Sequence, residues 1–414
     1  MSSSHTPITK DTWSRGFLRP AVLRNLSHGA NDIYWFVLPP VLPLILQEFG
    51  LRYTAAGGIV AAYLCMTAVA SMITGSWSDR IGRLRLIGFG FLLASVALWA
   101  GAIMPSLALV ITCIVIGGIG VSTYHPAAYA SIDDAGMANG RTYGLFEASG
   151  ALAVMVMLVL HGIFVSSIGW RGVIAVGAAP GAILGLLILL VPGASLGARP
   201  AAKERPAPAR IDAPRTMQAS MALSTLFIVG VMLRVLGVNA VQSFLPTYLV
   251  RSVHLDPGIA SFAMGLWFLG GAVGAIVMGR FADRRGAFLS FLIASGLFVP
   301  LLPILGLRLP TAIYPVLLLL FGFAGSGCFP PQNMILTALN VDRAKGQVFG
   351  LLMGLTTLTS SISPLLFGVL ADGAGLRTAI TVSALPVAAG WVVTIIVWGL
   401  WRRQNLQGRR DSLR

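Results

Sequence analysis

The sequence predicts an all-α membrane protein with twelve transmembrane helices, arranged as two six-helix bundles related by an internal repeat. Of its 414 residues, 56% are hydrophobic and 10% are charged, and the mean hydropathy is +0.83. Apolar stretches of about 20 residues recur along the chain, which is the length that a helix needs to cross a bilayer. A loop sequence also occurs twice. A chain with so little polar surface requires lipid as its solvent.

The predicted spans follow the apolar stretches in order. They lie near residues 31–48, 56–78, 87–104, 107–129, 143–165, 172–192, 219–248, 258–279, 288–307, 313–338, 347–370 and 378–401. The sequence also holds 48 glycines and 23 prolines. Glycine lets membrane helices approach closely and proline bends them, so this composition favours a bundle whose helices move.

The basic residues predict the orientation of the spans. The net charge is +15, and most of the 29 lysines and arginines fall in alternate connections and in the two terminal segments. By the positive-inside rule we expect both termini in the cytoplasm and a location in the cell (inner) membrane. Residues 1–24 are polar and basic without a cleavable signal, so they are interpreted as a retained tail. Topology explains the basic excess, and no nucleic-acid partner is expected.

The repeated loop has the pattern G-x-x-x-D-R-x-G. The residues of its two copies, with the arginine that follows the first, are Gly75, Asp79, Arg80, Gly82 and Arg83, then Gly279, Asp283, Arg284 and Gly286. The copies are 204 residues apart, and Gly118, Ser122 and Pro126 match Gly322, Ser326 and Pro330 at the same spacing. One half has therefore been copied.

The repeat suggests a gate. Glycine allows helices to touch, and aspartate caps helices or pairs with arginine, so we predict that this motif holds the cytoplasmic side shut in one state. The alternative is that its arginines only set the topology.

The repeat also divides the chain. We predict an N-terminal six-helix bundle over residues 1–192, a cytoplasmic linker over 193–217 that is rich in Pro, Ala and Arg, and a C-terminal bundle with a basic tail over 218–414. A parallel repeat places the substrate path between the halves, where rocking exposes it to each side in turn.

The doubled loop, the six-plus-six layout and the basic linker resemble the major facilitator superfamily over essentially the whole chain. The first loop departs from the usual family pattern at Trp77 and Leu84.

Within that superfamily, residues 26–32, residues 38–40 and Tyr124-His125-Pro126 are similar to the fosmidomycin-resistance type of exporter. Ala127 and Glu147 differ from that pattern, so the drug specificity is not carried over.

Ionisable residues at membrane depth are the candidates for energy coupling. No G-x-x-x-x-G-K-[ST] phosphate loop occurs, so ATP is not expected to drive transport directly, and no cofactor is expected. His28 and Asp32 are four residues apart and share a helix face, which predicts a pair that binds and releases a proton. The alternative is a fixed hydrogen-bonded pair.

Three further residues are candidates for coupling or substrate binding. Glu147, in the fifth span, is a second proton site or a gate residue. Arg234, near the middle of the seventh span, receives an anionic substrate group, neutralises Asp32 across the interface, or extends towards the membrane surface. His125 has either a functional role or a local hydrogen bond beside Pro126.

Polar and aromatic residues within the spans predict the lining of the substrate path. They are Asn31, Tyr34, Tyr124, Asn239, Gln242, Trp267, Gln332 and Asn333. Such a lining suits an amphipathic organic solute better than a bare ion, although packing or the membrane interface accounts equally well for some members. The three cysteines lack metal-ligand spacing, and we expect no metal site and no catalytic set.

These features predict a secondary active transporter, expected as a monomer. The leading hypothesis is proton-coupled export, or antiport, of small amphipathic organic compounds by alternating access. Proton-coupled import, or symport, of an organic anion is the alternative within this class. A membrane-embedded sensor or enzyme is the alternative from another class.

Overall fold

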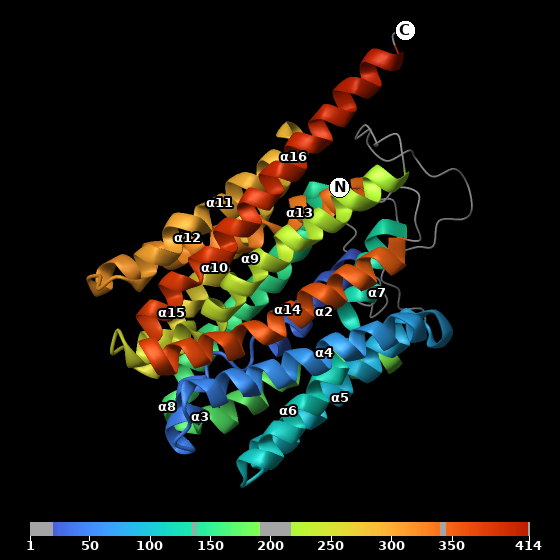
Figure 1. The fold of residues 1–414 in the computed structure, drawn as a ribbon. Coiled ribbons are helices and arrows are strands. Elements are labelled where there is room, and N and C mark those ends of the chain that lie inside the picture. Colours follow the sequence, from blue (N-terminus) through green and yellow to red (C-terminus); the bar gives the residue numbers. More distant parts are fainter. Residues whose placement is uncertain (1–19, 135–136, 138, 191–216, 340–344, 413–414) are drawn as a thin grey trace, which may run out of the picture.

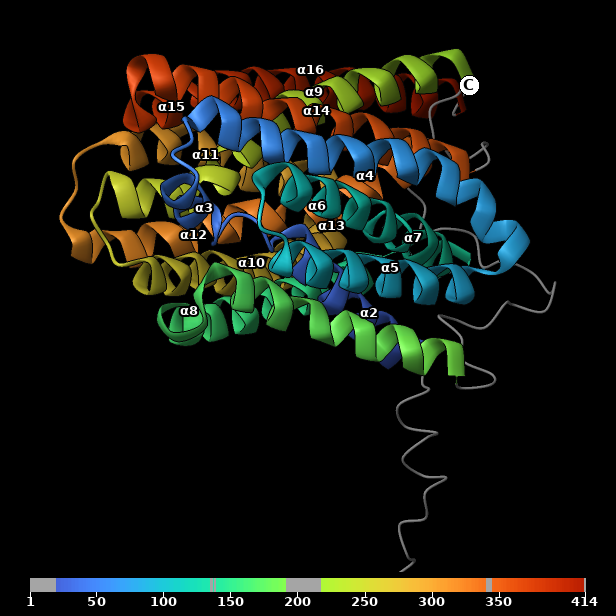
Figure 2. The same cartoon turned by 90° about the horizontal axis from the view of Figure 1, so that it is seen from below.

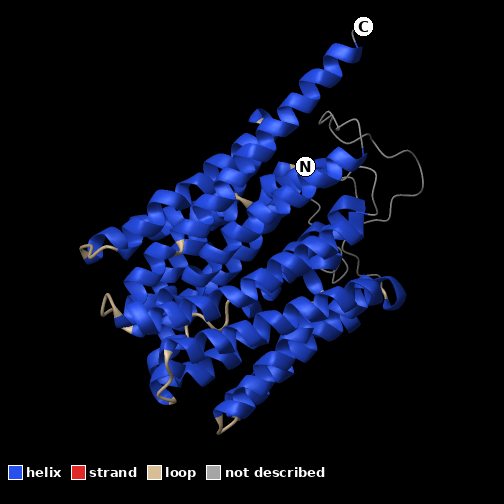
Figure 3. Ribbon diagram, in the orientation of Figure 1, coloured by secondary structure: helices blue, strands red, loops and turns tan. Residues whose placement is uncertain are grey.

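The computed structural model describes residues 20–134, 137, 139–190, 217–339 and 345–412. Regular structure within these ranges is entirely helical, and the long helices run side by side in one bundle (Figures 1 and 3). Most of the predicted linker, 193–217, lies outside the described residues.

Within the described residues, the N-terminal half has seven helices. They are α2 (Pro20–Trp35), α3 (Leu42–Glu48), α4 (Tyr53–Ile81), α5 (Arg83–Ile103), α6 (Leu107–Val121), α7 (Tyr124–Asp134) and α8 (Gly140–Leu190). The 51-residue α8 contains a non-helical residue, Gly169, with φ of 63°. It therefore corresponds to two successive predicted spans.

The C-terminal half repeats this order. Its elements are α9 (Met217–Arg251), α10 (Pro257–Arg285), α11 (Ala287–Gly306), the 3₁₀ turn η1 (Thr311–Ile313), α12 (Tyr314–Gly327), α13 (Phe329–Leu339), α14 (Lys345–Ala374), α15 (Leu376–Val382) and α16 (Ala384–Ser412). In Figure 1 this half lies to the upper left, with α14 set against α4.

The helices confirm the predicted twelve-span architecture. Ten helical segments of the described chain are long and apolar enough to cross a membrane, and α8 alone supplies two spans. The first span is the broken pair α2 and α3. Its predicted start at residue 31 was wrong, because α2 begins at Pro20 with polar residues that face the protein interior. Hydropathy alone does not detect such a helix.

Prolines lie in or just after the breaks that divide three of the spans. Tyr124-His125-Pro126 opens α7 after the break that ends α6, and Phe329-Pro330-Pro331 opens α13 after α12. Pro39 and Pro40 lie in the break between α2 and α3. The break near Pro126 therefore recurs near Pro330 in the second half, since proline cannot continue the helical hydrogen bonds.

The repeated loops have matching backbones. Gly82 precedes α5 with φ of 94°, and Gly286 precedes α11 with φ of 97°. Side chains rarely adopt this conformation, which explains the final glycine of the motif. We call the end of the bundle that carries these two glycines the motif end, and the end that carries Gly169 and Gly375 the opposite end.

Two helix pairs, α8 with α10 and α4 with α14, join the halves (Figure 2). At the motif end Gly140 and Gly279 are so close that a Cβ on either would collide with the carbonyl oxygen of the other. Gly162 and Gly258 approach each other similarly near the opposite end of the same pair. This pair is therefore in contact near both ends.

The outer surface of the bundle is apolar. Large hydrophobic side chains are exposed along most of the helices, among them Val69, Phe89, Val96, Ile183, Val273, Val316, Leu366 and Val392. Apolar exposure on this scale fits helices that face lipid tails. The protein is a multi-pass membrane protein.

Candidate functional site

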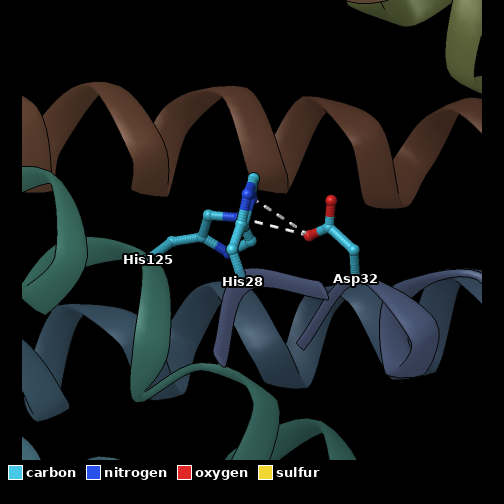
Figure 4. A group of neighbouring side chains, drawn as sticks. All are labelled: His28, Asp32 and His125. Atoms are coloured by element: carbon cyan, nitrogen blue, oxygen red, sulfur yellow. Dashed lines mark ion pairs between the residues drawn. The ribbon is translucent and has the colours of Figure 1, made fainter. Parts of the chain in front are cut away.

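Two histidines and one aspartate meet inside the N-terminal half (Figure 4). His28 and Asp32 lie on the same face of α2, and Nε2 of His28 is 3.4 Å from Oδ1 of Asp32. His125 reaches the same oxygen from the start of α7, with its Nε2 3.5 Å away. The helical break before α7 places His125 there. The four-residue spacing predicts that His28 pairs with Asp32, but the sequence gives no sign that His125 lies beside them.

The His28 ring is held from three sides. Its Nδ1 lies 2.7 Å from the carbonyl oxygen of Phe146 in α8 and must donate the hydrogen, because a carbonyl oxygen only accepts. The Phe146 ring stacks on it with a centroid separation of 3.8 Å, and Tyr124 stacks at 5.9 Å. His28 is fully buried, and its Nε2 has no hydrogen-bond partner. Its orientation is therefore set by the hydrogen bond to Phe146 and by ring stacking rather than by Asp32.

Asn31 orients His125. When the Asn31 amide is turned so that its contacts are all satisfied, its nitrogen donates to Val121 O and its oxygen accepts from His125 Nδ1 and Trp35 Nε1, each at 3.1 Å. We adopt that orientation, since a buried amide is normally fully hydrogen-bonded. Asn31 thus lies directly behind the site, and its place in the substrate path stays a prediction.

Glu147 lies beside this cluster with a tyrosine as its partner. Its Oε1 accepts a 2.6 Å hydrogen bond from the hydroxyl of Tyr129 in α7. Asn333 of α13 is a neighbour of Tyr129, so the second half approaches the site here. Sequence analysis did not single out Tyr129, although its position four residues after His125 gives both the same helix face.

The acids of this site lack basic partners other than histidine. In the part of the chain that the structure describes, the ion pairs of Asp32 are with His28 and His125, and Glu147 is hydrogen-bonded to Tyr129. Acids at membrane depth are expensive to charge and usually have functions. The arrangement is suited to binding a cation or a proton.

Arg234 forms a second polar site in the other half. It is 3% exposed, and one of its terminal nitrogens donates to Oε1 of Gln332 at 3.2 Å. The rings of Phe291 and Phe329 lie 5.9 and 5.8 Å from the guanidinium, and Nε has no partner. Its described partner is Gln332 and not Asp32, so the neutralisation of Asp32 by Arg234 is not seen in this structure.

The other predicted lining residues divide into two groups. Asn239 and Gln242 are half-buried on α9, while Tyr124 and Asn333 lie beside the sites described above. Tyr34 and Trp267 are instead packing residues. The Tyr34 hydroxyl is 2.7 Å from Ser95 Oγ, and Trp267 stacks on Phe321 at 5.3 Å, so each side chain is buried within its own half.

The second copy of the loop motif contacts the other half. Asp283 accepts hydrogen bonds from the backbone N–H groups of Gly140 at 2.9 Å and Arg141 at 3.0 Å, at the start of α8. A carboxylate there interacts favourably with the helix dipole. Arg284 is exposed. In the first copy, Arg83 is half-buried, and the side chains of Gly75, Asp79 and Arg80 lie outside the described residues.

A related contact at the opposite end was not predicted. Asp372, near the end of α14, accepts from the backbone N–H groups of Tyr53 and Thr54 at the start of α4, both at 3.0 Å. It also accepts from the Thr54 hydroxyl at 2.6 Å. The sequence does contain a sign of this contact, because Asp372 is an acidic residue at the end of an apolar span. Each helix pair that joins the halves thus has one aspartate capping a helix of the other half.

Glu48, at the end of α3, has an interaction within the N-terminal half at the opposite end. It accepts hydrogen bonds from Trp170 Nε1 at 2.6 Å and from Arg171 at 2.7 Å. The Trp170 hydrogen bond is the main cause that lowers the pKa of Glu48. Burial opposes it, and the hydrogen bond and the charge of Arg171 lower the pKa further. This contact ties the first span to the turn at Gly169.

A cavity of about 650 Å³ lies away from these sites. Its lining residues include Ser252, His254, Arg308 and Arg377, all near the opposite end of the C-terminal half. None of the predicted site residues lines it.

Comparisons with known proteins agree on one family. The model of the Major Facilitator Superfamily matches residues 25–336 and 226–413. The multidrug efflux pump Tap of Mycolicibacterium fortuitum is 25% identical over 402 residues, which cover 92% of this chain and 96% of the pump. The gallate transporter of Pseudomonas putida is 26% identical over 393 residues, covering 84% of each chain.

A solved structure shares the fold. It is a bacterial homologue of the human lysosomal transporter Spinster in an inward-facing and occupied conformation, with a TM-score of 0.72 at 16% identity over 96% of this chain and 99% of that one. This likeness and the family match together explain the twelve spans and the repeat. The chain belongs to the Major Facilitator Superfamily and is a membrane transporter rather than an enzyme.

Proposed function

We propose that this transporter exports small amphipathic organic compounds in exchange for protons, with Asp32, His28 and Glu147 as the proton-binding groups. The observation that carries the proposal is the pair of acids at membrane depth without a lysine or arginine partner among the described residues. Such a carboxyl group is neutral when it binds a proton and charged when it releases one. Inside the membrane, the charged state therefore has a much higher free energy than the neutral state.

Alternating access would use the contacts between the halves. Asp283 is hydrogen-bonded to α8 at the motif end, and Asp372 is hydrogen-bonded to α4 at the opposite end. We propose that the halves, residues 1–192 and 218–414, rock about the acids and break one of these contacts at a time. In this proposal the motif end and both termini are cytoplasmic, the membrane is the cell (inner) membrane, and the working unit is a monomer.

Two likenesses support export. The efflux pump Tap is similar along nearly the whole chain, and residues 26–32 with Tyr124-His125-Pro126 resemble the fosmidomycin-resistance type of exporter. Ala127 and Glu147 depart from that type. Fosmidomycin is therefore not proposed as the substrate.

Arg234 favours a second candidate, the import of an organic anion with protons. A buried guanidinium whose described partner is a neutral amide has capacity for an anionic group, and the likeness to a gallate transporter fits that class. The two candidates differ in the direction in which protons and solute move relative to one another.

Proton movement in proteoliposomes tests the proposal. Ethidium, an amphipathic cation, and gallate, an organic anion, are added to vesicles that contain a pH-sensitive dye. We expect solute-evoked proton flux in the intact protein and its loss in Asp32→Asn or Glu147→Gln. Solute flux without proton movement would contradict proton coupling.

A further inference from the structure

The three ligand atoms of His28, Asp32 and His125 all lie within 4.8 Å of one another. We infer that this cluster binds a divalent first-row transition-metal ion such as Zn²⁺. The inference goes beyond the proposed function, because it holds whichever solute is carried and in whichever direction. With the ion bound to Asp32 and His28, Glu147 remains as the proton-binding group of the proposed function.

Hydrogen bonding fixes which atoms face the centre of the cluster. His28 donates through Nδ1 to Phe146 O, so in the neutral ring Nε2 carries a lone pair. With the Asn31 amide oriented as above, His125 donates through Nδ1 to Asn31, and its Nε2 also carries a lone pair. Both Nε2 atoms face Oδ1 of Asp32, and the dashed lines in Figure 4 mark these two ion pairs.

Three acceptor atoms therefore converge without a donor among them. Buried acceptors that face one another are unfavourable unless a cation or a proton lies between them. His28 Nε2 has no hydrogen-bond partner in the structure. A nitrogen that serves as a metal ligand is expected to have none.

The spacing suits a small transition-metal ion. Zn²⁺ binds imidazole nitrogen and carboxylate oxygen at about 2.0–2.2 Å, so tetrahedral ligand atoms lie about 3.4 Å apart. The two distances to Asp32 Oδ1, 3.4 and 3.5 Å, match this value. The two histidine nitrogens, no more than 4.8 Å apart, would approach by a small rotation of His125.

The surroundings also resemble those of metal ligands. Ligating histidines normally donate their other N–H to a carbonyl or amide oxygen, as His28 does to Phe146 and His125 does to Asn31. Two imidazoles and one carboxylate select first-row transition metals over Mg²⁺ and Ca²⁺, which prefer oxygen ligands alone. Three protein ligands leave a coordination position for water or for a donor atom of a solute.

No metal site is predicted from the sequence, because the three ligands do not lie close together along the chain. His125 is 93 residues from Asp32, and only the break before α7 brings it to α2. The spacing of residues along one helix cannot indicate such a ligand.

Metal binding to the full-length protein tests the inference. The protein is purified in detergent, its affinity tag is removed, and it is titrated with Zn²⁺ by calorimetry and with Co²⁺ by visible absorption. We expect one ion per chain. Affinity should fall at least about tenfold in Asp32→Asn and in His125→Gln, since loss of a ligand exceeds the effect of a second-shell change. His254→Gln, which removes an exposed histidine at the opposite end, should bind like the intact protein.

X-ray absorption at the zinc edge is measured on the intact protein, so its result does not depend on whether the variants fold. The spectrum is expected to show two imidazoles and one oxygen as ligands. Binding no tighter in the intact protein than in His125→Gln, or an absorption spectrum without imidazole, would overturn the inference and leave a proton between the acceptors. Ion binding without solute-evoked proton flux would contradict only the proposed function. Flux without ion binding would contradict only the metal site.

Discussion

Glu147 lies at membrane depth with a tyrosine hydroxyl, rather than a basic side chain, as its hydrogen-bond partner. That difference separates two roles for the residue. A carboxyl group in a structural ion pair keeps its charge throughout the cycle, whereas one bonded to a neutral hydroxyl can exist with or without a proton. Substitutions that keep its shape therefore distinguish the two roles.

Glu147→Gln should uncouple transport without unfolding the protein. Glutamine keeps an oxygen that accepts from Tyr129, so the free energy of unfolding should change by less than about 1 kcal/mol. The proton site is lost, and pH-driven solute accumulation should fall at least about tenfold, which corresponds to ~1.4 kcal/mol. Tyr129→Phe is the matched control, because it removes the hydrogen bond and keeps the carboxyl. Equal coupling in Glu147→Gln and the intact protein would exclude Glu147 as the proton site.

Arg234→Gln should reduce the binding of organic anions. A hydrogen bond to a charged group contributes about 1.5–3 kcal/mol, so the affinity for gallate should fall about tenfold or more. Because the buried guanidinium has no acidic partner among the described residues, its removal should leave the melting temperature unchanged or raised. A fall in melting temperature with unchanged gallate binding would assign Arg234 a structural role instead.

Glu48 gives the protein a pH-dependent contact. Its pKa is lowered in the folded state, so its stabilisation is present above the unfolded value of about 4.3 and is lost as pH falls through the lower folded pKa. Its side chain is 40% exposed, so the contribution should stay below about 1 kcal/mol. The melting temperature of the intact protein should exceed that of Glu48→Gln at pH 7, and the difference should vanish below the folded pKa. A difference that is constant with pH would contradict the assignment.

Among the helices, the contacts between the halves follow one rule. A carboxylate at the end of a helix in the second half accepts from the first N–H groups of a helix in the other half, with Asp283 on α8 and Asp372 on α4. Such an interaction contributes about 0.3–1 kcal/mol at an exposed site. Breaking one of these contacts therefore costs little free energy.

Asp283→Asn should shift the population towards a state open at the motif end. Loss of about 0.3–1 kcal/mol changes the ratio of closed to open by about two- to fivefold. Spin labels at Arg141→Cys and Arg285→Cys, in a protein without its native cysteines, report the separation of α8 and α10 there. Longer distances are expected in Asp283→Asn and not in Asp372→Asn, which acts at the other end. The same distance distribution in all three proteins would contradict a gating role for Asp283.

The sequence predicted some of these elements and missed others for a physical reason. Hydropathy located the apolar helices, and the repeat located the loops at Gly82 and Gly286, because both are local properties of the chain. It placed the first helix too late, since α2 has an interior polar face. Helix periodicity gives the face of a residue but not its partner. The meetings of His125 with Asp32 and of Asp283 with α8 therefore required the structure.

At the scale of the whole molecule, the halves enclose their polar groups asymmetrically. The first half holds the cluster of His28, Asp32 and His125 together with the buried Arg24, and the second half holds the buried Arg234. The pairs α4 with α14 and α8 with α10 join the two halves in the present structure.

The measurement that tests the central claim most directly is solute accumulation in proteoliposomes driven by an imposed pH gradient alone. Ethidium is the preferred probe, because its permanent charge prevents passive trapping by acid. Proton-coupled antiport predicts accumulation in vesicles with an acidic lumen, its abolition by a protonophore, and its loss in Glu147→Gln. Accumulation in vesicles with an alkaline lumen would indicate symport. Equilibration that is insensitive to the gradient in either orientation would contradict proton-coupled transport.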